Sequence, residues 1–273
     1  MFVLGVCLLL SEQAHAGAWN QRAGEGQIIT TTHWARADGG NFDDELAVIS
    51  NFTKLETRLW LEHGLTDNLT LVLNGALQQI SYSDISEKVE FEGFDDTEFG
   101  LQFEIASKEG LAASIRASYI LDGQLDETAA TVLSPGDMGE IRILFGQSRE
   151  FSKGVIFHDA QFALRSANIQ RVEQVQGALT FGYKPNKRWA YMAQGFADHR
   201  FEFNRRTVIT RVNDRVTDIE FFGLEAQSQV TAQISAVWQY KPSRYIQIGG
   251  RQSLYGRNIV DETGLFLALW TEY

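Results

Sequence analysis

The chain has 273 residues, 44% of them hydrophobic, with a formal net charge of −11, three prolines and 24 glycines. Its mean hydropathy of −0.19 excludes a bundle of membrane-spanning helices. It does not exclude a membrane β-barrel, in which only alternate residues face lipid. An acidic chain with scattered Lys and Arg repels phosphate, so we expect no nucleic-acid partner.

The first residues have the pattern of an export signal. Residues 2–10 form a short apolar run, and Ala14-His15-Ala16 is a small-x-small cleavage site. We therefore predict a cleaved signal over 1–16 and one outer-membrane domain over 17–273. No Lys or Arg precedes the apolar run, so the sequence also allows a start codon upstream of Met1. Cys7, the only cysteine, is lost with the signal, and disulfides are not expected.

Polarity switches at every second residue over much of the chain. Phe99, Leu101 and Phe103 point one way, while Gly100 and Gln102 point the other. A period of two indicates β-strands, and one apolar face beside one polar face is typical of a wall between lipid and water. We predict an all-β fold, a single up-and-down antiparallel transmembrane β-barrel of about twelve strands. The expected strands are 25–36, 46–63, 68–82, 95–107, 110–122, 138–150, 154–167, 172–184, 188–203, 225–241, 244–256 and 262–273.

The connections between these strands alternate in length. Five are tight turns of two to five residues, rich in Pro, Asn, Asp, Gly and Ser. The longer ones are expected at 37–45, 83–94, 123–137 and 204–224. Short turns at one rim and long loops at the other are the outer-membrane arrangement. Segment 204–224 alternates around Asn213-Asp214, which predicts a hairpin beyond the membrane; counting it as two further spans would give fourteen strands.

The last predicted strand is apolar on one face and ends at Tyr273, the final residue. An aromatic carboxyl terminus on an alternating strand resembles the signal that the outer-membrane assembly machinery reads. We therefore predict that machinery as a partner, through the strand ending at Tyr273. Further aromatic residues lie beside tight turns, where an interfacial girdle is expected. They are Trp189, Tyr191, Trp238 and Tyr240.

The polar face of the predicted strands carries charges of both signs. In a narrow interior these charges are expected to pair across strands. One interpretation is a polar conduit for a small charged solute, and the other is a salt-bridged plug that fills a structural barrel. Twelve strands lie between the eight that leave room only for side chains and the sixteen that leave an aqueous channel. The pore-lining candidates are Lys54, Glu56, Arg58, Glu104, Arg116, Arg142, Arg165 and Arg251.

Signs of catalysis and of metal binding are weak. None of the histidines at 15, 33, 63, 158 and 199 is followed by Ser one or two residues on, the pattern of an outer-membrane lipid hydrolase. No two histidines have ligand spacing. The acidic groups Asp43-Asp44-Glu45 and Glu90, Glu92, Asp95 and Asp96 could hold Ca²⁺ through oxygen ligands, but ordinary acidity of solvated loops explains them better. We predict no enzyme, no metal site and no cofactor.

Two stretches resemble a known family. They are Gly17-Ala18-Trp19-Asn20-Gln21 with Gly24-Glu25-Gly26, and Leu61-Glu62-His63-Gly64-Leu65-Thr66-Asp67-Asn68. The chain resembles the putative MetA-pathway of phenol degradation family of proteobacterial outer-membrane proteins, whose members carry a glutamate-aromatic-glycine-leucine/valine-threonine-aspartate turn. His63 replaces the usual aromatic residue. The resemblance implies a barrel that assists passage of small, often aromatic or hydrophobic, compounds, and it implies no catalytic residues.

Together these patterns predict a passive, porin-like channel in the outer membrane of a Gram-negative bacterium. Its expected partners are outer-membrane lipid and lipopolysaccharide, the assembly machinery and a small-molecule solute that is anionic, aromatic or hydrophobic. Two alternatives stay open at this point. One is a plugged barrel that is structural or recognises a surface partner through its loops, and the other is an outer-membrane hydrolase.

Overall fold

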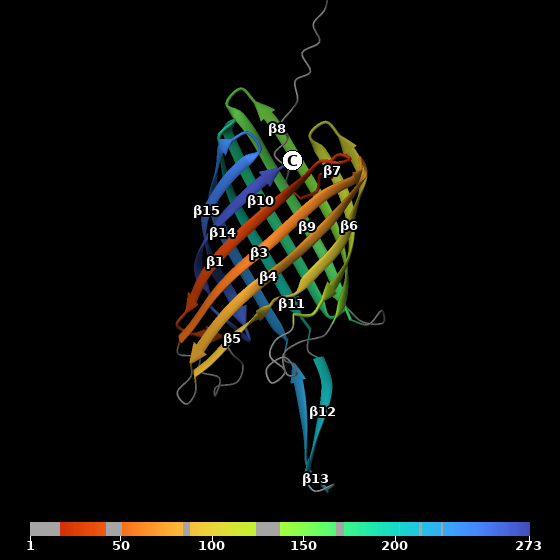
Figure 1. The fold of residues 1–273 in the computed structure, drawn as a ribbon, viewed down its shortest axis with the longest axis vertical. Helices are drawn as coiled ribbons and strands as arrows, with labels where there is room; N and C mark the ends of the chain where they lie inside the picture. The colour runs from red at the N-terminus through yellow and green to blue at the C-terminus, as the bar shows by residue number, and fades with distance from the viewer. Residues whose placement is uncertain are drawn as a thin grey trace, which may run out of the picture.

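The computed structural model describes residues 17–41, 51–83, 88–123, 137–167, 172–201, 203–212, 215–224 and 226–273. The expected signal at 1–16 lies outside them, as do Asp43 and Asp44. Twelve antiparallel strands close into a barrel (Figure 1). They are β1 (Gly26–Ala37), β3 (Asn51–Thr66), β4 (Leu69–Ser83), β6 (Thr97–Lys108), β7 (Leu111–Leu121), β8 (Met138–Phe151), β9 (Gly154–Ser166), β10 (Gln174–Asn186), β11 (Trp189–Arg200), β14 (Gln227–Lys241), β15 (Arg244–Arg257) and β17 (Thr263–Glu272).

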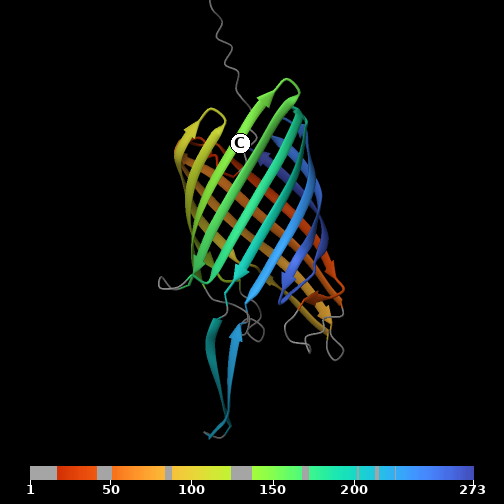
Figure 2. The same cartoon turned by 180° about the vertical axis from the view of Figure 1, so that it is seen from behind.

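The barrel closes between the two ends of the chain. Each strand pairs with its neighbour in the sequence, and β1 pairs with both β3 and β17. Tight turns and the carboxyl terminus lie at one end, which we call the short-turn end, and the longer connections lie at the other (Figures 1 and 2). Two of the tight turns use glycines at positive φ, Gly110 at 72° and Gly154 at 130°, a conformation that side chains disfavour. The all-β prediction and the count of twelve are confirmed.

One expected loop is a strand. β5 (Lys88–Phe94) pairs with the far half of β4, from Leu77 to Ser83, while β6 pairs with its near half. β5 and β6 therefore follow one another along the same edge of β4, separated by Asp95 and Asp96. The predicted loop at 83–94 is wrong over 88–94, because these two consecutive carboxylates interrupt the alternation where the ladder shifts register.

Two small two-stranded sheets lie outside the barrel wall. β12 (Phe203–Val212) and β13 (Arg215–Leu224) pair only with each other and extend beyond the long-loop end (Figure 2). This confirms the hairpin expected at 204–224 and excludes the fourteen-strand alternative. β2 (Gly40–Asn41) and β16 (Ile259–Val260) form another small sheet.

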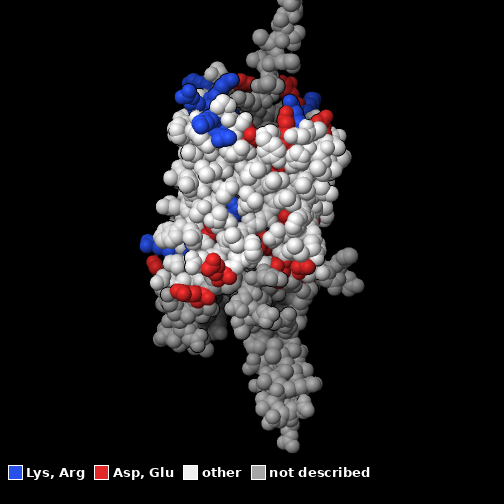
Figure 3. All heavy atoms as spheres, in the orientation of Figure 1, with Lys and Arg blue, Asp and Glu red and all other residues white. Residues whose placement is uncertain are grey.

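The two faces of the wall differ as the alternation requires. On β7 the side chains of Ala112, Arg116 and Ile120 are buried inside the barrel, whereas Ile115 and Leu121 are exposed on its outside. Charged side chains gather at the two ends of the outer surface, with a largely uncharged band between them (Figure 3). Within the described ranges no helix is long and apolar enough to cross a membrane.

Candidate functional site

Residues 17–25 precede β1, and we call them the inner segment. Residues 17–21 lie inside the barrel near its short-turn end, and residues 22–25 are exposed at its rim. Ala18 is fully buried and the Trp19 side chain is 4% exposed. They pack against inward-facing side chains from four strands: Ala112, Leu144, Phe157 and Met192. Because these belong to β7, β8, β9 and β11, the inner segment contacts a wide arc of the wall and occupies the lumen.

Hydrogen bonds tie the inner segment to β7 and to the next strands of the wall, β6 and β4. The Gln102 side chain of β6 donates to the Gly17 carbonyl at 3.0 Å and to Asn20 Oδ1 at 3.1 Å. Ser114 Oγ of β7 donates to the Ala18 carbonyl at 2.6 Å. The Gln21 backbone N–H donates to a β4 threonine hydroxyl at 3.0 Å. These bonds pair buried polar groups of residues 17–21 with the wall, so this part of the segment is held within the lumen.

A first charge cluster lies beside the inner segment. Glu62 accepts from the Gln21 side chain at 3.0 Å, from Gln27 at 2.6 Å and from the Trp60 indole at 3.1 Å. The Arg116 guanidinium stands 5.1 Å from the centre of the Trp60 ring and, at 2% exposure, is among the most buried charges of the protein. A buried charge requires paired partners; Arg116 donates twice to a Gln102 oxygen, at 2.9 and 3.2 Å, and lies 3.6 Å from a Glu98 oxygen.

Two further clusters lie closer to the long-loop end. Glu140 accepts from Arg142 and from Arg165, each at 2.7 Å. Across the barrel, Glu56 binds Lys54 at 2.7 Å and Arg58 at 2.9 Å, and Arg58 also binds Asp95. Carboxylates that each bind two cations offset the desolvation of all three groups. The structure thus brings together the predicted cations of neighbouring strands around shared carboxylates.

Two predicted residues stay outside these clusters. Arg251 donates to the Thr231 hydroxyl at 3.2 Å and stands 5.4 Å from the centre of the Phe196 ring. Glu104 lies near the short-turn end and forms no ion pair with any residue that the structure describes. That all eight candidates line a conducting path stays a prediction.

Two features of the site were not predicted. Trp60 lies between Arg58 and Glu62 on the inward face, a position that alternation alone would have identified. The inner segment contains part of the family motif, but nothing in its non-periodic sequence indicates that it folds into the lumen.

The structure also contains a histidine–serine contact between residues that are far apart in the sequence. His199 Nδ1 lies 2.8 Å from Ser228 Oγ, across the β11–β14 ladder and on the outward face. Phe201 packs edge-on against the imidazole at 4.7 Å. Among the described residues no carboxylate is bonded to His199, so the third member that orients a catalytic base is not in place.

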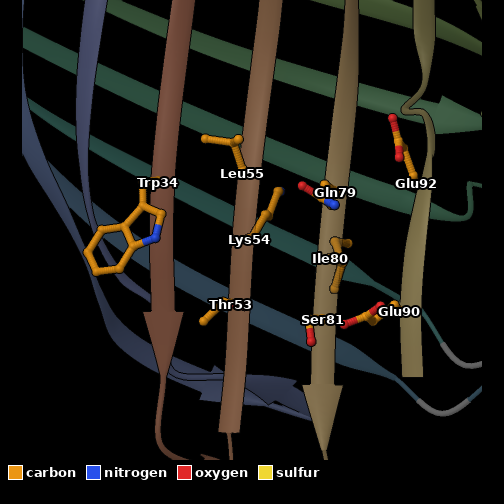
Figure 4. A pocket seen from close by; sticks show the side chains of 9 residues that line it. All are labelled: Trp34, Thr53, Lys54, Leu55, Gln79, Ile80, Ser81, Glu90 and Glu92. Carbon is orange, nitrogen blue, oxygen red and sulfur yellow. The ribbon is translucent and has the colours of Figure 1, made fainter. Parts of the chain in front are cut away.

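A groove of about 570 Å³ lies on the outside of the barrel, towards the long-loop end. Trp34, Leu55, Gln79 and Glu92 form one register row across β1, β3, β4 and β5 (Figure 4). Trp34 and Leu55 are about half exposed. A row that passes from apolar to acidic fits the boundary between lipid and water. In the described part of the chain, no three acidic, His or Cys side chains are grouped to hold a metal ion.

Comparison with known proteins supports the architecture. No profile of a known family and no curated protein matches the sequence, so membership of the MetA-pathway family is not confirmed. A COG4313 outer membrane channel from Pseudomonas putida F1 is similar in structure, with a TM-score of 0.67 and 13% identity over 96% of this chain and 100% of that one.

Two other solved structures are similar over most of their length. The NanC porin gives a TM-score of 0.51 at 8% identity, over 90% of this chain and 100% of that chain. The translocator domain of autotransporter NalP from Neisseria meningitidis gives 0.50 at 8% identity, over 94% and 91%. Identities this low show the fold alone. The chain has the fold of the β-barrels of Gram-negative outer membranes.

Proposed function

We propose that this protein is a passive, porin-like channel for small molecules. The observation that carries the proposal is a closed barrel whose inward face carries polar and charged side chains beside the inner segment and beyond it, towards the long-loop end. An interior meant only for stability is served as well by apolar side chains, since buried ion pairs add little net stability. Channels and porins among the solved structures with this fold support the same function.

The inner segment sets how such a channel conducts. It fills the short-turn end, which by the outer-membrane arrangement is the periplasmic end. The chain therefore conducts only through gaps beside the segment, or when the segment leaves its site. The same observation favours the second candidate, a plugged barrel whose role lies in its external loops.

The nature of the solute rests on two different arguments. Five of the eight predicted lumen residues are arginines, which favours small anions. The resemblance to the MetA-pathway family favours aromatic or hydrophobic compounds. Lipopolysaccharide at the outer surface and the assembly machinery at Tyr273 complete the proposed partners. A hydrolase is disfavoured, because the His199–Ser228 pair has no orienting acid among the described residues.

Single-channel conductance of the refolded chain from Gly17 onward, in a planar bilayer at two salt concentrations, tests the proposal. Discrete current steps with an ion preference are expected, and Arg58→Glu should shift that preference towards cations. Folding is checked first by heat-modifiable gel mobility. A silent bilayer from folded protein would reject the channel and favour the plugged barrel.

A further inference from the structure

A cavity of about 280 Å³ lies inside the barrel, directly beyond the inner segment. Along β8 the inward residue Leu144 packs against the inner segment, and the next inward residue, Arg142, lines the cavity. A solute that enters from the long-loop end therefore reaches this cavity before it reaches the inner segment. The other lining side chains relevant here are Gln176, Phe196, Asp198, Gln229, Thr231 and Arg251.

One of the two arginines in the cavity has donors to spare. A guanidinium carries five N–H donors, and Arg251 uses one of them, on the Thr231 hydroxyl. No carboxylate lies within 4.0 Å of Arg251 in the part of the chain that the structure describes. The Phe196 ring supports the guanidinium from one side. Arg251 is thus a positioned cation, half-buried in the lumen, without a close counter-ion.

The other arginine uses most of its donors. Arg142 donates twice to Glu140, at 2.7 and 3.0 Å, and also to Gln161 and Gln176. The Glu140 carboxylate compensates the positive charge of Arg142, so the uncompensated positive charge in the cavity is that of Arg251. An incoming anion meets one free cation rather than two.

A carboxylate on the opposite side of the cavity restricts what else can bind. Asp198 Oδ2 accepts from Gln174 at 2.5 Å and from Gln176 at 2.9 Å. The negative charge of Asp198 disfavours a second anionic group in the same small cavity. Its acceptor oxygens, together with the amide of Gln229, suit hydroxyl groups on the solute.

We infer that this cavity is a binding subsite for small hydroxylated monocarboxylates. The carboxylate of the solute binds the free donors of Arg251, its carbon skeleton lies over Phe196, and its hydroxyl groups bind at the Asp198 side. This inference rests on the proposed channel function for its biological meaning, since it names the solute class that the lumen selects.

Three probes separate the elements of the site. Gluconate carries one carboxylate, sorbitol carries none and glucarate carries two, on similar hydroxylated chains. Saturation-transfer NMR titration of the refolded chain in detergent micelles measures binding without requiring conduction. Gluconate should bind about tenfold or more tightly than sorbitol, the range expected for a hydrogen-bonded charge, and more tightly than glucarate.

Variants then assign the effect to residues. Arg251→Gln should weaken gluconate binding about tenfold or more, while leaving sorbitol unchanged. Arg244→Gln, which makes the same charge change at the exposed first residue of β15, should leave both unchanged. Asp198→Asn should raise the affinity for glucarate relative to gluconate, which tests the site independently if the Arg251 variant does not fold.

The outcomes are distinct from those for the channel. Equal gluconate affinity in Arg251→Gln and Arg244→Gln, or equal affinity for gluconate and sorbitol, would overturn the subsite even if the bilayer conducts. Gluconate binding that depends on Arg251 in a protein that stays silent in the bilayer would retain the subsite and reject the channel.

Discussion

Replacing Trp19 with alanine should open the lumen. The indole is buried against Ala112, Leu144 and Phe157, and it is the largest side chain that holds the inner segment in place. Truncation of a buried aromatic side chain to alanine costs about 3–5 kcal/mol. The barrel wall itself keeps all of its strand pairing, so this cost falls on the docking of the segment.

The magnitude follows from the two-state equilibrium between docked and undocked segment. A loss of about 3 kcal/mol raises the undocked fraction roughly 150-fold while that fraction remains small. Gly146→Leu should act in the same direction from the opposite side of the contact, because a Cβ at Gly146 would overlap the Trp19 ring. Two variants, one in the inner segment and one on β8, are therefore expected to give the same phenotype.

Planar-bilayer conductance and amide hydrogen exchange over residues 17–25 measure the effect. Both variants should increase the open-channel current and lower the protection of the inner segment. Trp189→Ala is the control, since Trp189 stacks on Trp238 at 6.2 Å on the outward face, away from the segment. If Trp19→Ala loses protection over 17–25 but conducts like the parent chain, the segment does not restrict the channel and the reasoning fails.

Three further predictions concern stability and assembly. Glu140→Gln leaves two arginines without their shared carboxylate, whose side chain is fully buried. It should lower the free energy of unfolding in urea by about 3–5 kcal/mol. Glu104→Gln, the control at a site without an ion pair among the described residues, should change the free energy of unfolding by no more than about 0.5 kcal/mol. The Tyr119 hydroxyl donates to Asp137 at 2.7 Å and lowers the pKa of that carboxylate. The contribution of this hydrogen bond to stability should therefore be present above the ordinary Asp pKa and be lost as pH falls through the lowered value. In Tyr119→Phe, NMR titration should show a higher pKa for Asp137, although the Asp122 backbone N–H, which also lowers this pKa, remains in place. Tyr273→Ser should reduce the fraction of folded, heat-modifiable protein in cell envelopes, and an unchanged fraction would contradict the proposed role of the last residue in assembly.

The alternating pattern predicts most of the wall because one lipid face and one polar face constrain every second residue. The prediction fails where that constraint is interrupted. Asp95 and Asp96 hide the continuity of β5 and β6, since two polar residues in succession are typical of a loop. The inner segment has no periodicity at all, and a short polar sequence with one tryptophan looks the same inside a barrel and outside it.

The partners of each charged residue in the lumen are harder to predict from sequence than the face of the wall on which its side chain lies. Alternation places Glu140, Arg142 and Arg165 on the same face, but only the register decides which of them meet. A slip of two residues between neighbouring strands keeps every side chain on its own face. In the structure Glu140 is directly opposite Arg165 and two residues from Arg142, a coincidence of register that no single sequence reveals.

The seam between β1 and β17 also dictates the order of assembly. Gln27 pairs with Glu272, so nearly the whole chain lies between the two strands that close the ring. Next to this pair, Gly26 and Tyr273 exchange backbone hydrogen bonds at 2.8 and 3.0 Å, where the chain turns from the wall into the lumen. Contacts so distant in sequence form late, because the entropy of closing a long loop opposes them. The first strand therefore gains its pairing with β17 only when the final strand is present. A chain truncated before β17 would lack both a closed wall and the Gly26–Tyr273 hydrogen bonds next to the inner segment.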